Sequence, residues 1–68
     1  MDDPKNYVYD THQKLYFVRK RINGKTEHFG SFKTEQQAKL AVELYNKTGW
    51  HKEDSGAIRA EVHEQLGD

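Results

Sequence analysis

The sequence lacks cysteine altogether and has a single proline, Pro4. Without cysteine, neither a disulfide framework nor a zinc site built on thiolates can help to hold the fold together. Long apolar runs are also missing, since no stretch approaches the length of a membrane span or of the hydrophobic region of a signal peptide. We therefore expect no membrane association and a cytoplasmic location.

The chain has no net charge, but its charges are unevenly placed. From Lys5 to Lys52, ten Lys or Arg stand against four Asp or Glu, which leaves +6, whereas residues 1–4 carry −2 and residues 53–68 carry −4. A basic core with an acidic tail favours a surface that binds polyanions, because Lys and Arg neutralise phosphates. The alternative is that a small domain scatters its charges without such a role.

The dipeptide Asn23-Gly24 predicts a tight hairpin between two strands. A two-residue type I′ turn needs positive φ at both central positions, and Asn and Gly tolerate this best. Counting outward from the turn gives the register. The predicted pairs are Ile22 with Lys25, Arg21 with Thr26, Lys20 with Glu27, Arg19 with His28 and Val18 with Phe29.

This register sorts the hairpin side chains by face, because side chains alternate along a strand. The mostly apolar face carries Tyr16, Val18, Ile22 and Phe29. The basic and polar face carries Phe17, Arg19, Arg21, Thr26 and His28. Lys20 conflicts with this division, because its position places it on the apolar face; we expect its ammonium to extend from the sheet edge towards Glu27, directly across the hairpin.

A helix is predicted after the hairpin. Thr34 and Gln37 have the spacing of a capping box, and Glu35 places a negative charge in the first turn. Gly49 suits the left-handed residue that follows a helix, and Trp50 can fold back on the last turn as in a Schellman motif. The stripe at helical spacing that would cover the apolar face of the hairpin is Ala38, Ala41, Val42 and Tyr45.

Shorter elements are predicted at both ends of the chain. Residues 1–6 are expected to be a flexible N-terminus. Residues 7–9 read as a first strand, and the polar residues 10–14 turn the chain back into an antiparallel meander. Periodicity does not decide which face the two tyrosines of that strand take. Residues 51–56 read as a polar connector, and residues 57–66 as a second helix with Ser55 as a candidate N-cap and Gly67 as a candidate C′ residue.

The second helix needs a partner, because ten residues are too few for an isolated helix to persist in water. Its apolar stripe is formed by Ile58, Val62 and Leu66. Leu40 and Leu44 lie one turn apart on the first helix, outside the stripe that faces the sheet. Either the second helix docks on these two leucines, or they form an interface with a protein partner or with a second copy of the chain.

Together these elements predict an α+β fold. It consists of a three-stranded antiparallel sheet packed on one α-helix, with a short additional C-terminal helix. Residues 7–50 would form the sheet-plus-helix domain, and residues 51–68 the connector and the acidic C-terminal helix.

The run Phe-Gly-Ser-Phe-Lys-Thr-Glu-Gln-Gln-Ala at residues 29–38, with the Asn-Gly hairpin before it, resembles the AP2-type DNA-binding domain of phage and prokaryotic proteins. It is also similar to the arm-binding domains of tyrosine recombinases. The resemblance implies a protein of a phage, mobile element or regulatory system that lays the open face of its sheet into the major groove of double-stranded DNA. A nucleoid-associated location follows from that function.

The resemblance also implies DNA-contacting roles for particular residues. They are Phe17, Arg19, Arg21, Thr26 and His28, which the register had already placed on one face, with Lys14 and Lys25 near the strand ends. The arginines would reach phosphates or guanine edges, and Phe17 would pack on sugar or on a thymine methyl group. The alternative for Phe17 is that the C-terminal segment or the first loop covers it.

Chemistry of other kinds is not indicated. The four histidines share no metal-binding spacing, and no Ser-His-acid arrangement or phosphate-binding glycine loop is visible. We expect a protein that is not an enzyme and that uses no cofactor, metal or small-molecule substrate. The alternative to DNA binding is a protein-interaction module on the same fold, with either Phe17 and the tyrosines or Leu40 and Leu44 as the contact patch. Two departures from the AP2 pattern keep that alternative open: the open face lacks the tryptophans common in plant AP2 domains, and the net charge is zero.

Overall fold

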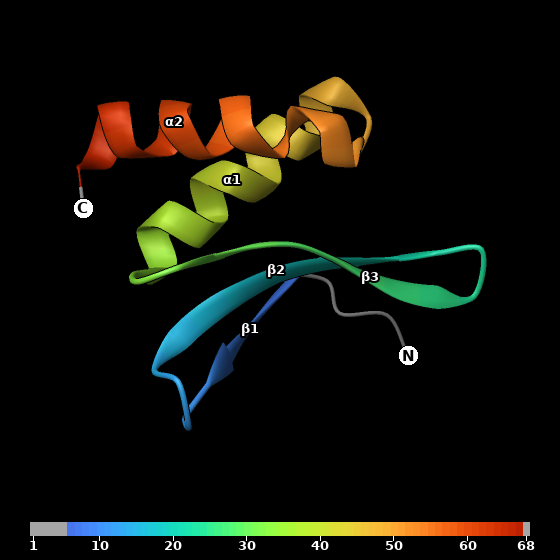
Figure 1. The fold of residues 1–68 in the computed structure, drawn as a ribbon, viewed down its shortest axis with the longest axis horizontal. Helices are drawn as coiled ribbons and strands as arrows, with labels where there is room; N and C mark the ends of the chain where they lie inside the picture. Colours follow the sequence, from blue (N-terminus) through green and yellow to red (C-terminus); the bar gives the residue numbers. More distant parts are fainter. Residues whose placement is uncertain (1–5, 68) are drawn as a thin grey trace.

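Three antiparallel strands are followed by two helices in the computed structural model, which describes residues 6–67 (Figure 1). The elements are β1 (Tyr7–Asp10), β2 (Leu15–Ile22), β3 (Lys25–Phe32), α1 (Glu35–Thr48), a 3₁₀ turn η1 (Lys52–Asp54) and α2 (Ser55–Leu66). The predicted α+β fold is confirmed. The prediction of a flexible N-terminus falls on residues 1–5, which lie outside the described part of the chain, and on Asn6, where a bend leads into β1.

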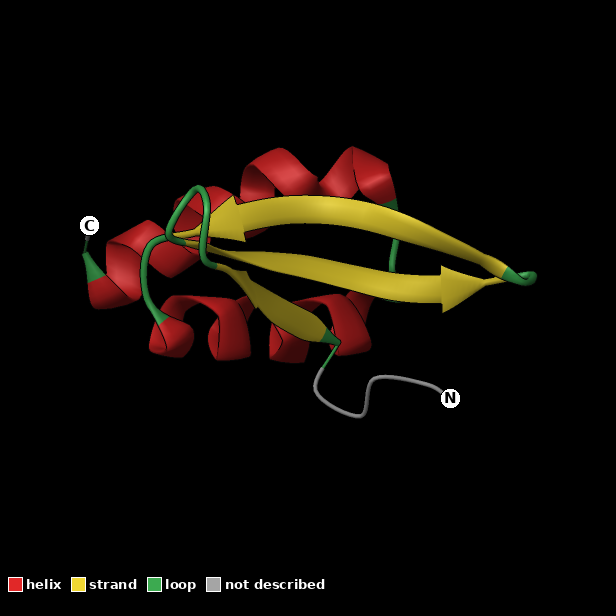
Figure 2. Cartoon of the chain, turned by 90° about the horizontal axis from the view of Figure 1, so that it is seen from below, coloured by secondary structure: helices red, strands yellow, loops and turns green. Residues whose placement is uncertain are grey.

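The molecule has three layers, with α1 between the sheet and α2 (Figure 1). The strands lie in the order β1-β2-β3, as a meander requires. All the described helices lie on one side of the sheet, so the other side is open when the molecule is viewed from below (Figure 2). In the described residues, neither helix has the length and apolar character needed to cross a membrane.

The register of the β2–β3 hairpin contains a β-bulge. Four predicted pairs are confirmed, from Ile22 with Lys25 to Arg19 with His28. The fifth prediction is wrong, because Val18 pairs with Gly30 and Phe29 is the additional residue on β3. The reason lies in the core: Phe29 and Phe32 are three positions apart, so a regular strand would send them to opposite faces. The bulge lets both phenyl rings enter the core, where both are buried.

The helix-facing side of the sheet holds the core. Tyr7, Val18, Phe29 and Phe32 are buried there against Ala38, Ala41 and Tyr45 of α1. The register of β1 answers the question that periodicity left open: Tyr7 pairs with Val18 and Tyr9 with Tyr16, so the tyrosines take this side. Tyr9 and Tyr16 pack ring against ring, with centroids 4.8 Å apart.

Helix α1 begins and ends as predicted. Thr34 accepts a hydrogen bond from the Gln37 backbone N–H, and the Gln37 side chain accepts one from Thr34 N–H, which completes the capping box. Gly49 takes a φ of +95°, and the backbone N–H of Trp50 donates to the carbonyl of Tyr45. The Trp50 ring then stacks on the Tyr45 ring, with centroids 5.0 Å apart and planes 13° apart. The Schellman-type contact is confirmed.

Helix α2 begins earlier than predicted. It starts at Ser55, and a 3₁₀ turn occupies half of the expected connector, so Ser55 is the first helical residue and not the N-cap. Ile58 and Val62 are buried against the core, and Leu40 of α1 packs against the same cluster. Docking of the second helix on the first is confirmed. Leu66 is the exception in its stripe, with 45% of its surface exposed.

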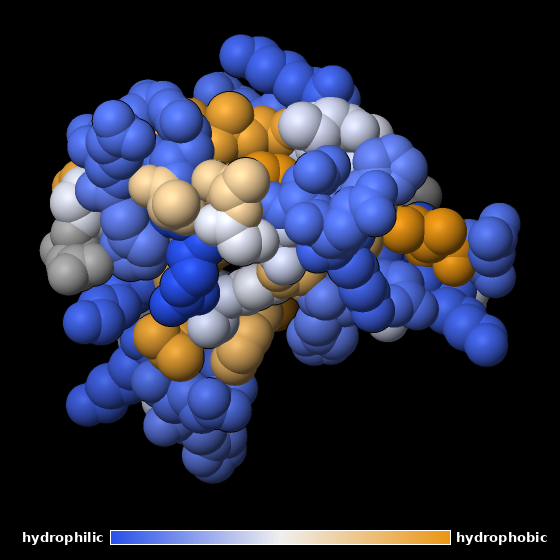
Figure 3. All heavy atoms as spheres, turned by 45° about the horizontal axis from the view of Figure 1, so that its top comes forward, coloured by the Kyte–Doolittle hydropathy of each residue, from blue (hydrophilic) through white to orange (hydrophobic). Residues whose placement is uncertain are grey.

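Polar contacts hold α2 in place at two points. The side-chain amide of buried Gln37 donates to the carbonyl of Gly67, 2.5 Å away. Arg59 donates to the carbonyl of Ser31 at 2.9 Å, and its guanidinium lies over the Phe32 ring. The surface on the α2 side is mostly hydrophilic, with small, separated apolar patches (Figure 3).

A double substitution of Asn23 and Gly24 by valine tests the hairpin. These residues have φ of +53° and +81°, and each β-branched residue held in that region costs about 1–3 kcal/mol. We expect a large loss of stability and of the cross-strand contacts nearest the turn, measured by urea denaturation and by nuclear Overhauser effects between Arg21 and Thr26. An unchanged midpoint with the same strand pairing would contradict the assigned turn.

Candidate nucleic-acid interface

The side of the sheet turned away from α1 forms a continuous surface across all three strands (Figure 2). We call this surface the open face and define it by four cross-strand rows: Asp10–Leu15, Val8–Phe17–Ser31, Arg19–His28 and Arg21–Thr26. No helix in the described part of the chain lies over it. The five residues predicted from the hairpin register therefore do share one face, although the register itself contains the bulge.

The half of the open face nearest the hairpin turn is basic and polar. Arg19 and Arg21 are two positions apart on β2, so their Cα atoms are about 7 Å apart along an extended strand. Thr26 and His28 lie directly across the ladder from them and are exposed. The Arg19 backbone is fixed further, because its N–H donates to the carbonyl of Asn6 at 2.8 Å. This half brings two arginines, a threonine and a histidine together on one surface.

The other half of the open face is apolar. Val8, Leu15 and Phe17 lie on it and are half-buried. The Phe17 ring meets the edge of the His28 ring, with centroids 6.2 Å apart and planes 71° apart, so the two halves are in contact. Helix α2 lies on the far side of α1, so its described residues do not cover Phe17 (Figure 1). Val8 and Leu15 were missed from the sequence because the loop after β1 does not set a register as Asn23-Gly24 does.

Lys14 and Lys25, the remaining predicted residues, lie apart from this surface. Lys14 ends the β1–β2 loop with a φ of +57°, and its N–H donates to the carbonyl of Asp10 at 2.7 Å. Asp10 also accepts from the backbone of His12 and Gln13, which orders the loop. Lys25 is exposed and pairs with Ile22, so its strand position faces the helix side. It lies at the tip of the hairpin, which projects beyond the helices (Figure 1).

The Lys20 side chain takes a different partner from the one expected. Although Lys20 and Glu27 are paired across the hairpin, the Lys20 ammonium lies over the Trp50 ring, 5.2 Å from its centroid. Glu27 instead forms an ion pair with Lys52 of η1. The sequence could not show this, because Lys52 lies 25 positions after Glu27 and approaches it only once α1 has packed on the sheet. Both contacts tie the basic hairpin to the segment that links α1 to α2.

The Glu27–Lys52 pair predicts a measurable pKa effect. The hydrogen bond from Lys52, and then its charge, lower the pKa of the Glu27 carboxyl. A lowered pKa means that the pair stabilises the fold above the ordinary pKa of glutamate, about 4.3, and that this contribution is lost as the pH falls through the lower value of the folded protein. We expect Lys52→Met to return the Glu27 pKa towards its ordinary value in a carbon-detected NMR titration, whereas Lys47→Met should leave it unchanged. An unaltered Glu27 titration in Lys52→Met would contradict the assignment.

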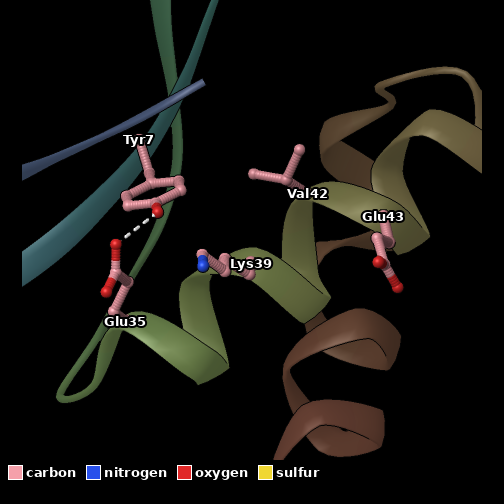
Figure 4. A pocket seen from close by; sticks show the side chains of 5 residues that line it. All are labelled: Tyr7, Glu35, Lys39, Val42 and Glu43. Atoms are coloured by element: carbon pink, nitrogen blue, oxygen red, sulfur yellow. Dashed lines mark hydrogen bonds between the residues drawn. The ribbon is translucent and has the colours of Figure 1, made fainter. Parts of the chain in front are cut away.

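A second surface feature lies between β1 and α1. It is an open hollow of about 310 Å³ lined by Tyr7, Glu35, Lys39, Val42 and Glu43 (Figure 4). The Tyr7 hydroxyl donates to Glu35 at 2.7 Å at one end, and Glu43 lies away from this pair. The hollow carries charges of both signs and lies on the helix side, so it does not extend the open face. Within residues 6–67 no three His, Asp or Glu side chains are grouped as metal ligands.

Charge follows the layers of the fold. Arg19 and Arg21 belong to the open face, whereas η1 and α2 carry Glu53, Asp54, Glu61 and Glu64 against Lys52 and Arg59. Helix α1 lies between much of α2 and the sheet (Figure 1), although Arg59 of α2 also reaches Ser31 of β3. The uneven charge seen along the sequence therefore becomes an uneven charge in space, with an acidic layer on the side opposite the open face.

Comparison of the chain with protein-family models, with curated proteins and with solved structures found no match. The resemblance to AP2-like and recombinase arm-binding domains therefore stays a prediction from the residues.

Proposed function

We propose that this domain binds double-stranded DNA through the open face of its sheet. The observation that carries the proposal is the placement of two arginines, a threonine and a histidine on one face that no described helix covers, with an excess of acidic over basic residues on η1 and α2. Contacts between basic side chains and phosphates supply most non-specific DNA affinity, and an acidic layer held away from the duplex opposes binding least.

The shape of the hairpin supports entry into the major groove. That groove is about 12 Å wide and admits a two-stranded β-ribbon. The β2–β3 hairpin extends past both helices, so its tip and the Arg19 and Arg21 region can approach a duplex without the helices meeting the backbone first (Figure 1). The AP2-like resemblance, which implies the same docking, adds support to this orientation and to a phage, mobile-element or regulatory context.

Within this proposal the residues divide by role. Arg19 and Arg21 contact phosphates or the O6 and N7 atoms of guanine, which arginine binds in a bidentate manner. Thr26 and His28 add polar contacts from the neighbouring strand, and Phe17 packs against sugar or a thymine methyl group. Lys14, in the β1–β2 loop, and Lys25, at the tip of the hairpin, lie apart from the open face, so they would contact phosphates only through their long flexible side chains.

The binding itself is tested by fluorescence anisotropy with a labelled mixed-sequence duplex of about 20 base pairs at 50 and 200 mM salt. We expect saturable binding that weakens steeply with salt, because each neutralised phosphate releases counterions. Matched measurements with a labelled polyglutamate of equal charge separate DNA recognition from attraction to any polyanion. Absence of duplex binding at 50 mM salt would contradict the proposal.

A protein-interaction module is the second candidate, and the apolar half of the open face favours it. Val8, Leu15 and Phe17 form an apolar group on a face that no described helix covers, which is a common property of protein-binding surfaces. Leu40 and Leu44 remain a candidate contact patch as well, although both are half-buried beside α2. If Phe17→Ala abolished binding of the domain to its ligand, and Arg19→Ala and Arg21→Ala left that binding intact, this second candidate would replace DNA binding.

A further inference from the structure

The β-bulge in β3 lies where the two halves of the open face meet. On one side of it Val18 pairs with Gly30, and on the other Arg19 pairs with His28. Phe29, the additional residue, points into the core and is buried. Any change in the bulge therefore alters how the row of Arg19 and His28 is aligned with the row of Phe17 and Ser31.

One side chain of α1 reaches this bulge. The Tyr45 hydroxyl donates a hydrogen bond to the carbonyl of Phe29 at 3.1 Å, in a fully buried position. The Tyr45 ring is only 1% exposed and is held on both sides, with Phe29 edge-on at 5.0 Å and Trp50 stacked at 5.0 Å. The phenol therefore has little freedom to move away from the carbonyl that it binds.

The surroundings keep this phenol protonated. Burial raises the pKa of Tyr45, the Asp54 carboxylate raises it further, and a hydrogen bond with the Ser55 side chain works in the opposite direction. A tyrosine that ionises above its usual value of about 10 remains a hydrogen-bond donor throughout the physiological range. The hydroxyl therefore keeps the proton that it donates to the Phe29 carbonyl.

The carbonyl of Phe29 has particular need of such a donor. A bulge residue is left unpaired in the strand ladder, and a buried carbonyl without a donor costs free energy. An alternative register, with Val18 opposite Phe29, would restore a regular ladder but would turn Phe32 out of the core towards the open face. The Tyr45 hydroxyl stabilises the bulged register against this alternative.

We propose that Tyr45 is a positioning residue for the open face, acting through the bulge and not through contact with DNA. The part of this inference that concerns DNA affinity rests on the proposed function. The hydroxyl fixes Phe29, the fixed bulge sets the alignment of Arg19 and His28 with Phe17, and that alignment presents the polar and apolar halves of the open face to one ligand. A buried tyrosine remote from the open face thereby determines how well the face binds.

The test is Tyr45→Phe, which removes the hydroxyl and keeps the ring. We expect a folded protein in which the Phe29 and Gly30 amides exchange about fivefold faster, as loss of one hydrogen bond implies, and in which the nuclear Overhauser effects between the Phe17 and His28 rings weaken. Duplex affinity should fall by a comparable factor when measured well below the melting temperature. Tyr9→Phe, which alters a tyrosine that is 49% exposed, is the matched control and should change none of these quantities.

Val62→Ala separates positioning from stability. Val62 is fully buried in α2, away from the bulge, so this variant should lower the melting temperature yet keep the Phe17–His28 contact and the wild-type affinity while it is folded. The inference is overturned if Tyr45→Phe leaves the exchange of the bulge amides and the contact between the Phe17 and His28 rings unchanged. It is also overturned if Val62→Ala, compared at equal folded fraction, weakens duplex binding as much as Tyr45→Phe does. If wild-type protein binds no duplex, the proposed function fails, and the exchange and ring-contact data still decide whether the hydroxyl aligns the face.

Discussion

Replacing Arg19 and Arg21 together by alanine is expected to weaken duplex binding by at least about tenfold at moderate salt. The two side chains supply the positive charge at the centre of the open face, since their strand positions place them on one side of β2. Each phosphate contact that is lost should also reduce the slope of log affinity against log salt by about one. A contact to guanine should instead cost roughly 1–3 kcal/mol at one base position. Anisotropy titrations across a salt series and across single-base variants of the duplex distinguish these cases.

The control for this prediction changes charge elsewhere. Lys39 and Lys47 are exposed on α1, away from the open face, and their double replacement by alanine removes the same formal charge. We expect that variant to bind nearly as well as the wild type. Equal losses in the two double variants would mean that net charge alone governs binding, and the open face would then have no special role.

Ending the chain at Lys52 is expected to produce the largest loss of stability. Helix α2 contributes the buried side chains of Ile58 and Val62, and burying an aliphatic side chain stabilises a protein by about 1.5–3 kcal/mol. Removing both therefore costs about 3–6 kcal/mol, a large part of the 5–15 kcal/mol typical of small domains. The truncated chain should be largely unfolded or close to it, as measured by circular dichroism during thermal and urea denaturation.

Leu66→Ala provides the comparison for the truncation. Leu66 belongs to the same helical stripe by spacing, but its side chain is 45% exposed, so we expect its loss to change the free energy of unfolding by about 0.5 kcal/mol or less. The truncation also removes Glu53 and Asp54 of η1 and the hydrogen bonds from Gln37 to Gly67 and from Arg59 to Ser31, whereas Leu66→Ala leaves all of these in place. A truncated chain that melts like the full chain would show that α2 contributes little to the core.

Features determined by neighbours in the sequence could be predicted well. The Asn23-Gly24 turn, the Thr34–Gln37 capping box and the Gly49 helix end each depend on residues within a few positions of one another, and each is found as expected. Because the turn fixes the nearest pairs, the placement of Arg19, Arg21, Thr26 and His28 on one face followed from the sequence alone.

Features determined by tertiary packing could not be predicted in the same way. The bulge exists because Phe29 and Phe32 both enter the core, and the hairpin turn carries no information about that requirement. The spacing of the two phenylalanines was the available signal, since three positions do not fit the two-residue period of a strand. The partner of the Lys20 side chain could not be predicted for the same reason, because the contact with Trp50 depends on where the chain folds back at the end of α1.

The open face thus combines predicted and unforeseen parts. Its basic half was predicted from the hairpin, whereas Val8 and Leu15 were added by the register of β1. The apolar half gives the proposed DNA contact a surface that can pack against sugars and methyl groups beside the arginines. It also explains why a protein partner is the strongest competing candidate, because the same surface would suit an apolar protein ligand.

A titration of ¹⁵N-labelled protein with an unlabelled mixed-sequence duplex, followed by backbone and arginine side-chain chemical shifts at low and moderate salt, tests the central claim most directly. Binding through the open face predicts salt-sensitive shift changes concentrated at Phe17, Arg19, Arg21, Thr26 and His28, with little change along α2. Shift changes concentrated on α1 or α2, or no changes at low salt, would contradict DNA binding through the open face.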